Sequence, residues 1–120
     1  MLRDLSLRAA GLLAIAIALG HGAVAELYVF HKAEIAPQGT RRLLRLIWQA
    51  STIDWIAVGV LLIAAPALGS EVARRWIVAI AVVIYGYAAI ANAIAVGGWH
   101  VGWVAMTAAI ALALLGLYGP

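Results

Sequence analysis

The carboxyl-terminal part of the chain contains one long run without a charged residue, from Trp76 to Tyr118. As a single helix this run would be about 65 Å long, roughly twice the thickness of a bilayer's hydrocarbon core. The run must therefore fold back on itself. Gly97 and Gly98 are the best place for the turn, because glycine tolerates the positive φ of a tight reversal. Two apolar helices are expected, over residues 76–96 and 99–118.

Two further apolar stretches precede this run, at about residues 7–30 and 43–68. Each is long enough to cross a hydrocarbon core of about 30 Å as a helix. Pro37 and Gly39 interrupt the polar linker between them, and a short polar turn around Glu71 separates the second stretch from the third. We therefore predict an all-α fold, an integral membrane four-helix bundle that forms a single transmembrane domain.

The overall composition favours the same fold class. The chain is 67% apolar and 11% charged, and its mean hydropathy is +1.06. A soluble four-helix bundle needs polar outer faces, whereas long stretches here are apolar all the way round. The basic residues lie beside apolar segments, so the net charge of +3 predicts anionic lipid headgroups as partners rather than nucleic acid. A multi-pass protein of the bacterial inner membrane is the expected class.

The first apolar stretch also resembles a secretory signal peptide. Arg3 and Arg8 precede it, and Ala23–Ala25 before Glu26 forms an Ala-x-Ala cleavage pattern. Cleavage would leave three helices. However, the apolar character resumes at once over Leu27–Phe30, so that a cleaved product would begin inside a hydrophobic segment. We therefore expect the first helix to be retained.

The distribution of Lys and Arg does not decide the orientation of four such helices. The positive-inside rule counts these residues in the loops and helix ends on each side of the membrane. The count is tied, which leaves open a single orientation fixed by other features or dual insertion as an antiparallel dimer. The basic residues are Arg3, Arg8, Arg74 and Arg75 on one side, and Lys32, Arg41, Arg42 and Arg45 on the other.

Polar residues of all four predicted helices fall in one leaflet, while the opposite half is almost purely aliphatic. Polar and ionisable groups within hydrocarbon are costly, so each is a candidate functional residue. This asymmetry is the strongest functional signal in the chain. The candidate binding residues are His21, Glu26, Arg45, Gln49, Thr52, Asp54, Asn92 and His100.

Glu26 and Asp54 each lie more than a turn inside a predicted helix, where an unpaired carboxylate is unfavourable. His21 precedes Glu26 by five residues and so does not share its face. Partners for these groups should come from other helices. Arg45, Gln49 and Thr52 share one face, and we expect that row to meet Glu26 across the bundle. A structural polar network and a ligand site are both open interpretations of this cluster.

Other candidates have simpler explanations. His31 and His100 fit headgroup depth, and four tryptophans fit an aromatic belt at the membrane interface. With no cysteine, neither a disulfide framework nor thiolate ligation of a metal is available. The sequence predicts no metal site, no resident cofactor and no catalytic group of residues. The belt tryptophans are Trp48, Trp55, Trp99 and Trp103.

A few of these positions together resemble a group of uncharacterised four-helix bacterial inner-membrane proteins. The resemblance implies a four-helix membrane bundle and no particular activity. In that group a histidine often stands at the place of Gln49, so a metal or haem role through that histidine would not extend to this chain. The positions that carry the resemblance are His21, Glu26, Arg45, Trp48, Gln49 and Trp55.

Three functional hypotheses follow from the residues. The first is a non-enzymatic accessory or interaction protein that associates with other membrane subunits or with itself. The second is a small oligomeric transporter that exchanges protons at Glu26 or Asp54. The third is a redox protein in which His21 and His100 hold a b-type haem, or in which these groups bind a quinone headgroup. Because no nucleophile or base is recognisable, we favour the accessory class over an enzyme.

Overall fold

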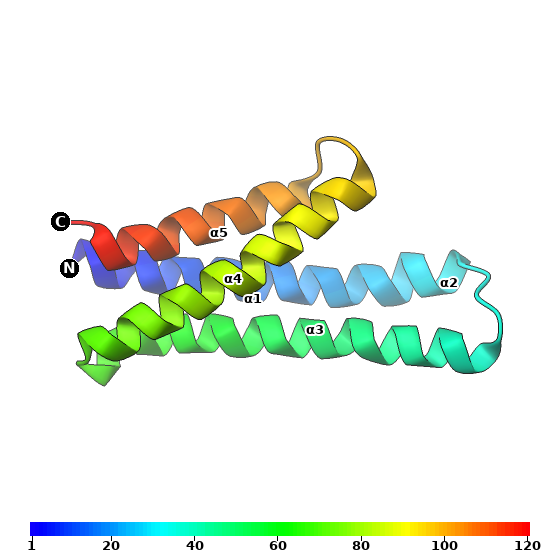
Figure 1. Ribbon diagram of the computed structural model, residues 1–120, viewed down its shortest axis with the longest axis horizontal. Helices are drawn as coiled ribbons and strands as arrows, with labels where there is room; N and C mark the ends of the chain where they lie inside the picture. Colours follow the sequence, from blue (N-terminus) through cyan, green and yellow to red (C-terminus); the bar gives the residue numbers. More distant parts are fainter.

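The computed structural model describes residues 1–120 and consists of helices and connecting turns, with no strand (Figure 1). The helices form four rods, and each rod is long and apolar enough to cross a membrane. The first rod combines α1 (Leu2–Val24), the π-helical turn η1 (Ala25–Val29) and α2 (Phe30–Lys32). The second combines α3 (Gln38–Ala64) and the 3-10 turn η2 (Ala65–Leu68), and the others are α4 (Glu71–Val96) and α5 (Val101–Tyr118).

The first two rods extend beyond the apolar stretches at their charged ends. The first rod begins at Leu2 instead of about residue 7, and the second begins at Gln38 instead of about residue 43. Arg41 and Arg42 therefore belong to α3, and the linker shrinks to residues 33–37. Hydrophobicity marks the part of a helix that suits lipid, whereas the backbone can stay helical well into the polar region.

Side-chain caps fix the starts of the last two rods. The Ser70 hydroxyl accepts a hydrogen bond from the Ala73 amide at 3.2 Å, so α4 begins at Glu71, five residues before the apolar run. His100 plays the same part for α5, because its Nδ1 accepts from the Gly102 amide at 3.0 Å. These bonds satisfy amides that have no partner within the helix.

The predicted reversal at Gly97 is confirmed. Gly97 has a φ of 67° and ends α4, and Gly69 has a φ of 60° in the turn between η2 and α4. Both lie in the left-handed region that side chains disfavour. Two tight turns thus return the chain across the bundle.

The first rod is the centre of the arrangement. Helix α1 packs along α3 on one side and along α5 on the other, while α4 packs on α5 and meets α3 over a shorter stretch. The two termini lie at the same end of the molecule as the α3–α4 turn (Figure 1). At the opposite end, α2 and the start of α3 project beyond the α4–α5 turn. One end of the bundle is therefore only two helices thick.

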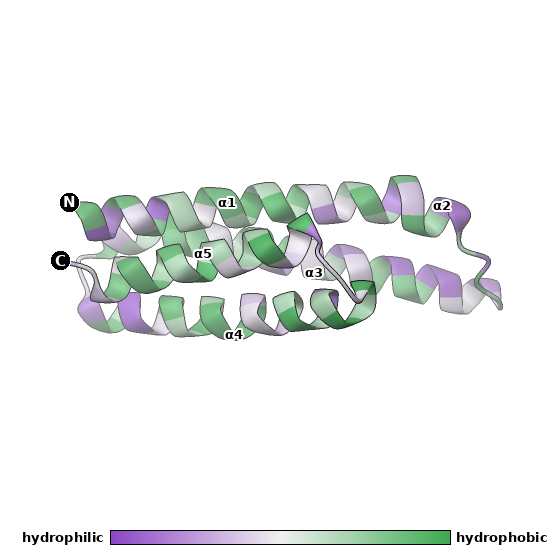
Figure 2. Ribbon diagram, turned by 90° about the horizontal axis from the view of Figure 1, so that it is seen from above, coloured by the Kyte–Doolittle hydropathy of each residue, from purple (hydrophilic) through white to green (hydrophobic).

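Small residues bring α1 and α3 into backbone contact. A Cβ atom added at Gly11 would lie 2.4 Å from the Gly59 carbonyl oxygen, which is closer than real Cβ atoms approach. The core beside this crossing includes Leu7, Leu62 and Tyr85, each almost fully buried. Only 24 of the 120 residues are buried, so most apolar side chains lie on the outer surface. Hydrophobic residues cover the rods, and hydrophilic ones gather mainly near the ends (Figure 2).

Candidate functional site

Glu26 is the centre of a polar cluster between the first two rods. Arg45 contacts both oxygens of its carboxylate, with Nη2 at 2.5 Å from Oε2 and Nε at 3.0 Å from Oε1. Gln49 Nε2 donates to the same Oε1 at 2.8 Å and to the Gly22 carbonyl at 3.3 Å. A two-pronged guanidinium contact of this kind fixes both the position and the orientation of a carboxylate.

Local backbone features allow this cluster to form. Glu26 lies in the π-helical turn η1, and turns of this type often occur at functional sites. One turn earlier, a Cβ atom at Gly22 would lie 3.0 Å from Thr52 Cγ2 and 3.1 Å from Gln49 Oε1. Because Gly22 has no side chain, α3 can pack closely against the first rod at this point. Arg45 and Gln49 thus meet Glu26 as predicted, whereas Thr52 of the same row lies beside Gly22 and donates to the Trp48 carbonyl of its own helix.

His21 lies between two tryptophans of α3. Its ring stacks on Trp48 with centroids 4.8 Å apart, and it packs at a tilt against Trp55 at 4.3 Å. The Trp48 indole also donates to the His21 carbonyl at 3.3 Å. The sequence analysis predicted an interfacial belt for both tryptophans, and the structure adds that they pack against His21. Their spacing of seven residues on one face of α3 is the signal that would have indicated a shared role.

The hydrogen bonds of His21 define its neutral tautomer. Ser51 Oγ lies 2.6 Å from the Trp48 carbonyl and 3.2 Å from His21 Nε2. The serine has one hydroxyl proton, which it donates to the carbonyl, so it accepts from His21 Nε2–H. In the neutral ring Nδ1 is then free to accept a hydrogen bond. Because Nε2 is occupied, haem ligation by His21 through that atom is not favoured.

A cavity of about 530 Å³ lies beside His21, between the first rod, α3, α4 and α5. Aliphatic side chains line it together with Trp48, Trp55, Asn92 and His100, and no charged residue does. The structure therefore brings together three predicted site residues from three helices. Asn92 Oδ1 is fully buried and has no hydrogen-bond partner.

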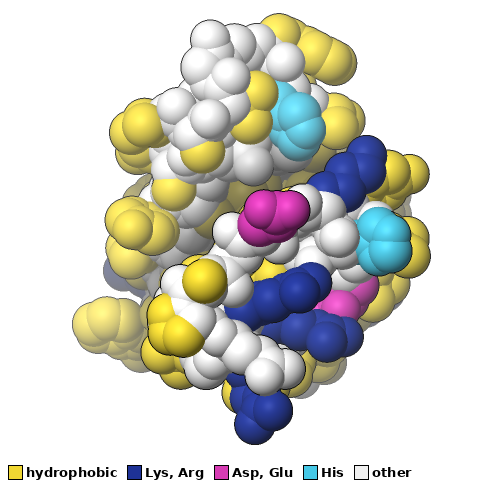
Figure 3. Space-filling model, turned by 90° about the vertical axis from the view of Figure 1, so that its right-hand side faces the viewer, with side chains coloured by type: hydrophobic (Ala, Val, Ile, Leu, Met, Phe, Trp, Pro, Cys, Tyr) yellow, Lys and Arg dark blue, Asp and Glu magenta, His cyan; other side chains and the backbone are white.

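A second cavity, of about 480 Å³, opens beyond Glu26 at the projecting end of the first two rods. Figure 3 faces this end, where basic side chains gather around a carboxylate. Arg41 donates from Nη2 to the Phe30 carbonyl and so ties the start of α3 to α2. The polar residues that line the cavity are Glu26, His31, Gln38, Arg41, Arg42 and Arg45.

Asp54 does not join either group, in contrast to the single cluster that the sequence suggested. It is exposed on α3 and takes part in none of the ion pairs or side-chain hydrogen bonds. It follows Gln49 by five residues, about 140° round the helix, which turns it away from Glu26. It lies near the middle of the second rod, which runs from Gln38 to Leu68.

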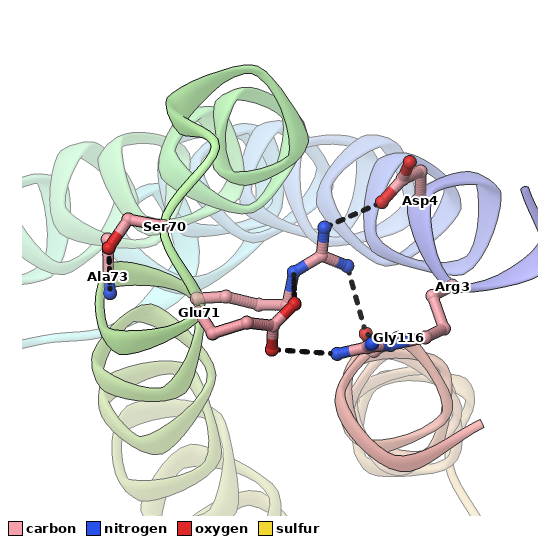
Figure 4. A network of polar contacts seen from close by, with 7 residues as sticks. Arg3, Asp4, Ser70, Glu71, Ala73 and Gly116 are labelled. Carbon is pink, nitrogen blue, oxygen red and sulfur yellow. Dashed lines mark hydrogen bonds and ion pairs between the residues drawn. The ribbon is translucent and has the colours of Figure 1, made fainter. Parts of the chain in front are cut away.

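The other end of the bundle contains an ion-pair network that the sequence analysis missed (Figure 4). Arg74 contacts Asp4 at 2.7 Å and Glu71 at 3.6 Å, and Arg3 contacts Glu71 at 2.9 Å. Both arginines also donate to the Gly116 carbonyl, at 3.2 Å from Arg74 and 3.4 Å from Arg3. Basic side chains thus cap the last turn of α5. The network joins residues of three rods that lie far apart in the sequence. Helical periodicity does not show contacts of this kind, so the sequence alone could not reveal them.

No group of three or more His, Cys, Asp or Glu side chains is arranged to hold a metal ion. The residues described above provide ion pairing, neutral hydrogen bonding and aromatic stacking. Comparison with known proteins found no matching family model, no matching curated protein and no matching solved structure.

Proposed function

We propose that this chain is a multi-pass membrane protein that acts as a non-enzymatic interaction subunit, and that it docks another membrane protein through the Asp54 face of α3. The observation that carries the proposal is an exposed, unpaired carboxylate halfway along an apolar rod. The apolar outer surface supports insertion, because contiguous surfaces of this extent aggregate in water. The bacterial inner membrane is the expected location.

The position of Asp54 supports a need for a partner. It lies about 24 Å from the start of the second rod and about 21 Å from its end, at 1.5 Å per residue. In a bilayer this corresponds to the hydrocarbon region, where an unpaired carboxylate is strongly disfavoured. A neighbouring helix that offers a cation or a hydrogen-bond donor removes that penalty.

The surface around Asp54 suits a packed helix. Ala50 and Ala57 lie about one turn away on either side, and both are exposed. Small residues at such positions let two helix backbones approach closely, which is how helices associate in lipid. Ile47 and Leu61 continue the exposed stripe above and below. We call this stripe, residues 47, 50, 54, 57 and 61, the Asp54 face.

Charge complementarity indicates a different protein rather than a second copy. All eight Lys and Arg residues lie toward the two ends of the rods, so an identical chain offers no cation at the depth of Asp54. We therefore expect a transmembrane helix with a Lys or Arg inside its apolar span. The transport hypothesis is weakened at Glu26, because Arg45 and Gln49 already hold that carboxylate.

Gentle extraction of an epitope-tagged chain from its native membranes, followed by mass spectrometry, tests this function. We expect a stoichiometric partner with a basic residue inside a transmembrane span. Asp54→Leu should abolish its recovery. Glu34→Leu is the matched control, because Glu34 is also exposed and unpaired but lies in the linker. A chain that purifies alone, or a partner that Asp54→Leu retains, would contradict the proposal.

A further inference from the structure

The cavity beside His21 has walls of two kinds. One wall is aromatic, where the His21 ring lies against Trp48 and Trp55. The remaining walls are mostly aliphatic residues of α1, α4 and α5. Val24 and Val101 line the cavity and are 48% and 62% exposed, so it opens on the outer surface of the bundle. Its volume of about 530 Å³ lies within the range of small-molecule sites.

Polar atoms at the cavity are left without partners inside the protein. His100 Nδ1 accepts from the Gly102 amide, so the neutral ring carries its proton on Nε2 and can donate it. Asn92 Oδ1 is buried and unpartnered, which is rare for a buried amide oxygen in a folded protein. The site thus offers one neutral donor, His100 Nε2, and two neutral acceptors, Asn92 Oδ1 and His21 Nδ1.

These features select the class of ligand. No Asp, Glu, Lys or Arg lines the cavity, so nothing there compensates a charged molecule. An acyl chain would fill the volume but would leave the Asn92 oxygen without a donor. A planar ring with two hydroxyl groups satisfies both polar groups, because one hydroxyl can donate to Asn92 Oδ1 while the oxygen of the other accepts from His100 Nε2. The ring also stacks on the aromatic wall.

We propose that this cavity binds the ring of a lipid-soluble quinol. The oxygen of one hydroxyl accepts from His100 Nε2, and the other hydroxyl donates to Asn92 Oδ1. The isoprenoid tail leaves past Val24 and Val101 into the lipid. The proposal is independent of the docking function, because the Asp54 face and the cavity share no residue.

Two glycines provide a matched pair of variants for the test. Gly20 lines the cavity, and a Cβ atom added there meets no atom within 4 Å. Gly20→Leu should therefore fill the cavity without a backbone clash. Gly86 lies on α4 outside the cavity, and a Cβ atom added there also meets nothing. Gly86→Leu repeats the same change without blocking the site.

The experiment is calorimetric titration of the full chain in lipid nanodiscs with a decyl-substituted benzoquinol, kept reduced under an oxygen-free atmosphere, with empty nanodiscs as the blank. We expect saturable binding that Gly20→Leu weakens at least about tenfold and that Gly86→Leu and Asp54→Leu leave unchanged. Circular dichroism checks that the variants fold. Heat that does not exceed the blank would mean that lipid fills the cavity, and it would overturn the proposal. Equal binding by Gly20→Leu would overturn it as well.

Discussion

Tyr85 connects the buried core to the aromatic wall of the cavity. It is 2% exposed, and its hydroxyl donates to the Trp55 carbonyl at 2.9 Å. That bond holds α4 against the part of α3 where Trp55 packs on His21. The residue therefore serves both the packing of two helices and the shape of the candidate ligand site.

Tyr85→Phe should lower the free energy of unfolding by about 1 kcal/mol, because one buried hydrogen bond is lost without a change in volume. Equilibrium unfolding in mixed micelles measures the effect. Tyr87→Phe is the control, since Tyr87 is 76% exposed and its hydroxyl makes no hydrogen bond within the chain. Equal destabilisation by both variants would contradict the role of the Tyr85 bond.

Asn92 gives a second prediction that concerns a single residue. Replacing it with Leu removes a buried oxygen that has no partner, so the ligand-free chain should be no less stable than the unchanged one. The same variant should bind the quinol analogue more weakly, because one hydroxyl of the ligand loses its acceptor. Thermal unfolding and the calorimetric titration measure the two effects side by side. A loss of stability together with unchanged binding would mean that Asn92 is a packing residue.

At the scale of the elements, the number of helices and their main turn were predictable because both follow from length and local chemistry. The run from Trp76 to Tyr118 is too long for one span, and Gly97 provides the turn. The contacts of Glu26 were also within reach, because Arg45 and Gln49 share a face one turn apart. Helical periodicity alone shows that Arg45 and Gln49 lie on the same face of the helix.

The missed features depend on which face of each helix meets a neighbour. Trp48 and Trp55 fit an interfacial belt as well as a buried wall, because tryptophan suits both environments. Asp54 lies only five residues after Gln49 on the same helix but points elsewhere. Helices that are apolar all round contain no signal for their rotation. The position of a polar residue along its helix was therefore easier to predict than the direction in which its side chain points.

The crossing of α1 and α3 should tolerate little added volume. At Gly11 the nearest atom to an added Cβ is a backbone oxygen at 2.4 Å, which cannot move aside as a side chain can. Gly11→Val should destabilise the fold by at least about 1–3 kcal/mol or prevent its formation. Gly86→Val, with open space at the same type of position, should remain folded. Size-exclusion profiles and thermal unfolding distinguish the two.

At the scale of the whole molecule, the arrangement places the termini and the α3–α4 turn at one end and the 33–37 linker at the other. The chain has no cysteine, so a single introduced cysteine is a background-free reporter. In vesicles of one orientation, an impermeant thiol reagent should label Gly119→Cys and Glu34→Cys from opposite sides. Labelling of both from one side would contradict four crossings, whereas half-labelling of each would reveal dual insertion.

The hydrogen bonds from Arg3 and Arg74 to the Gly116 carbonyl bear on the order in which the helices can pack during synthesis. Arg3 leaves the ribosome before its acceptor on α5, which lies 113 residues later in the chain. Helix α1 can pair with α3 as soon as α3 is made, yet its other side, which packs against α5, stays uncovered until α5 has been made. A chain that lacks α5 would leave both guanidinium groups without that acceptor. This end of the bundle therefore reaches its final arrangement only once α5 has packed against α1.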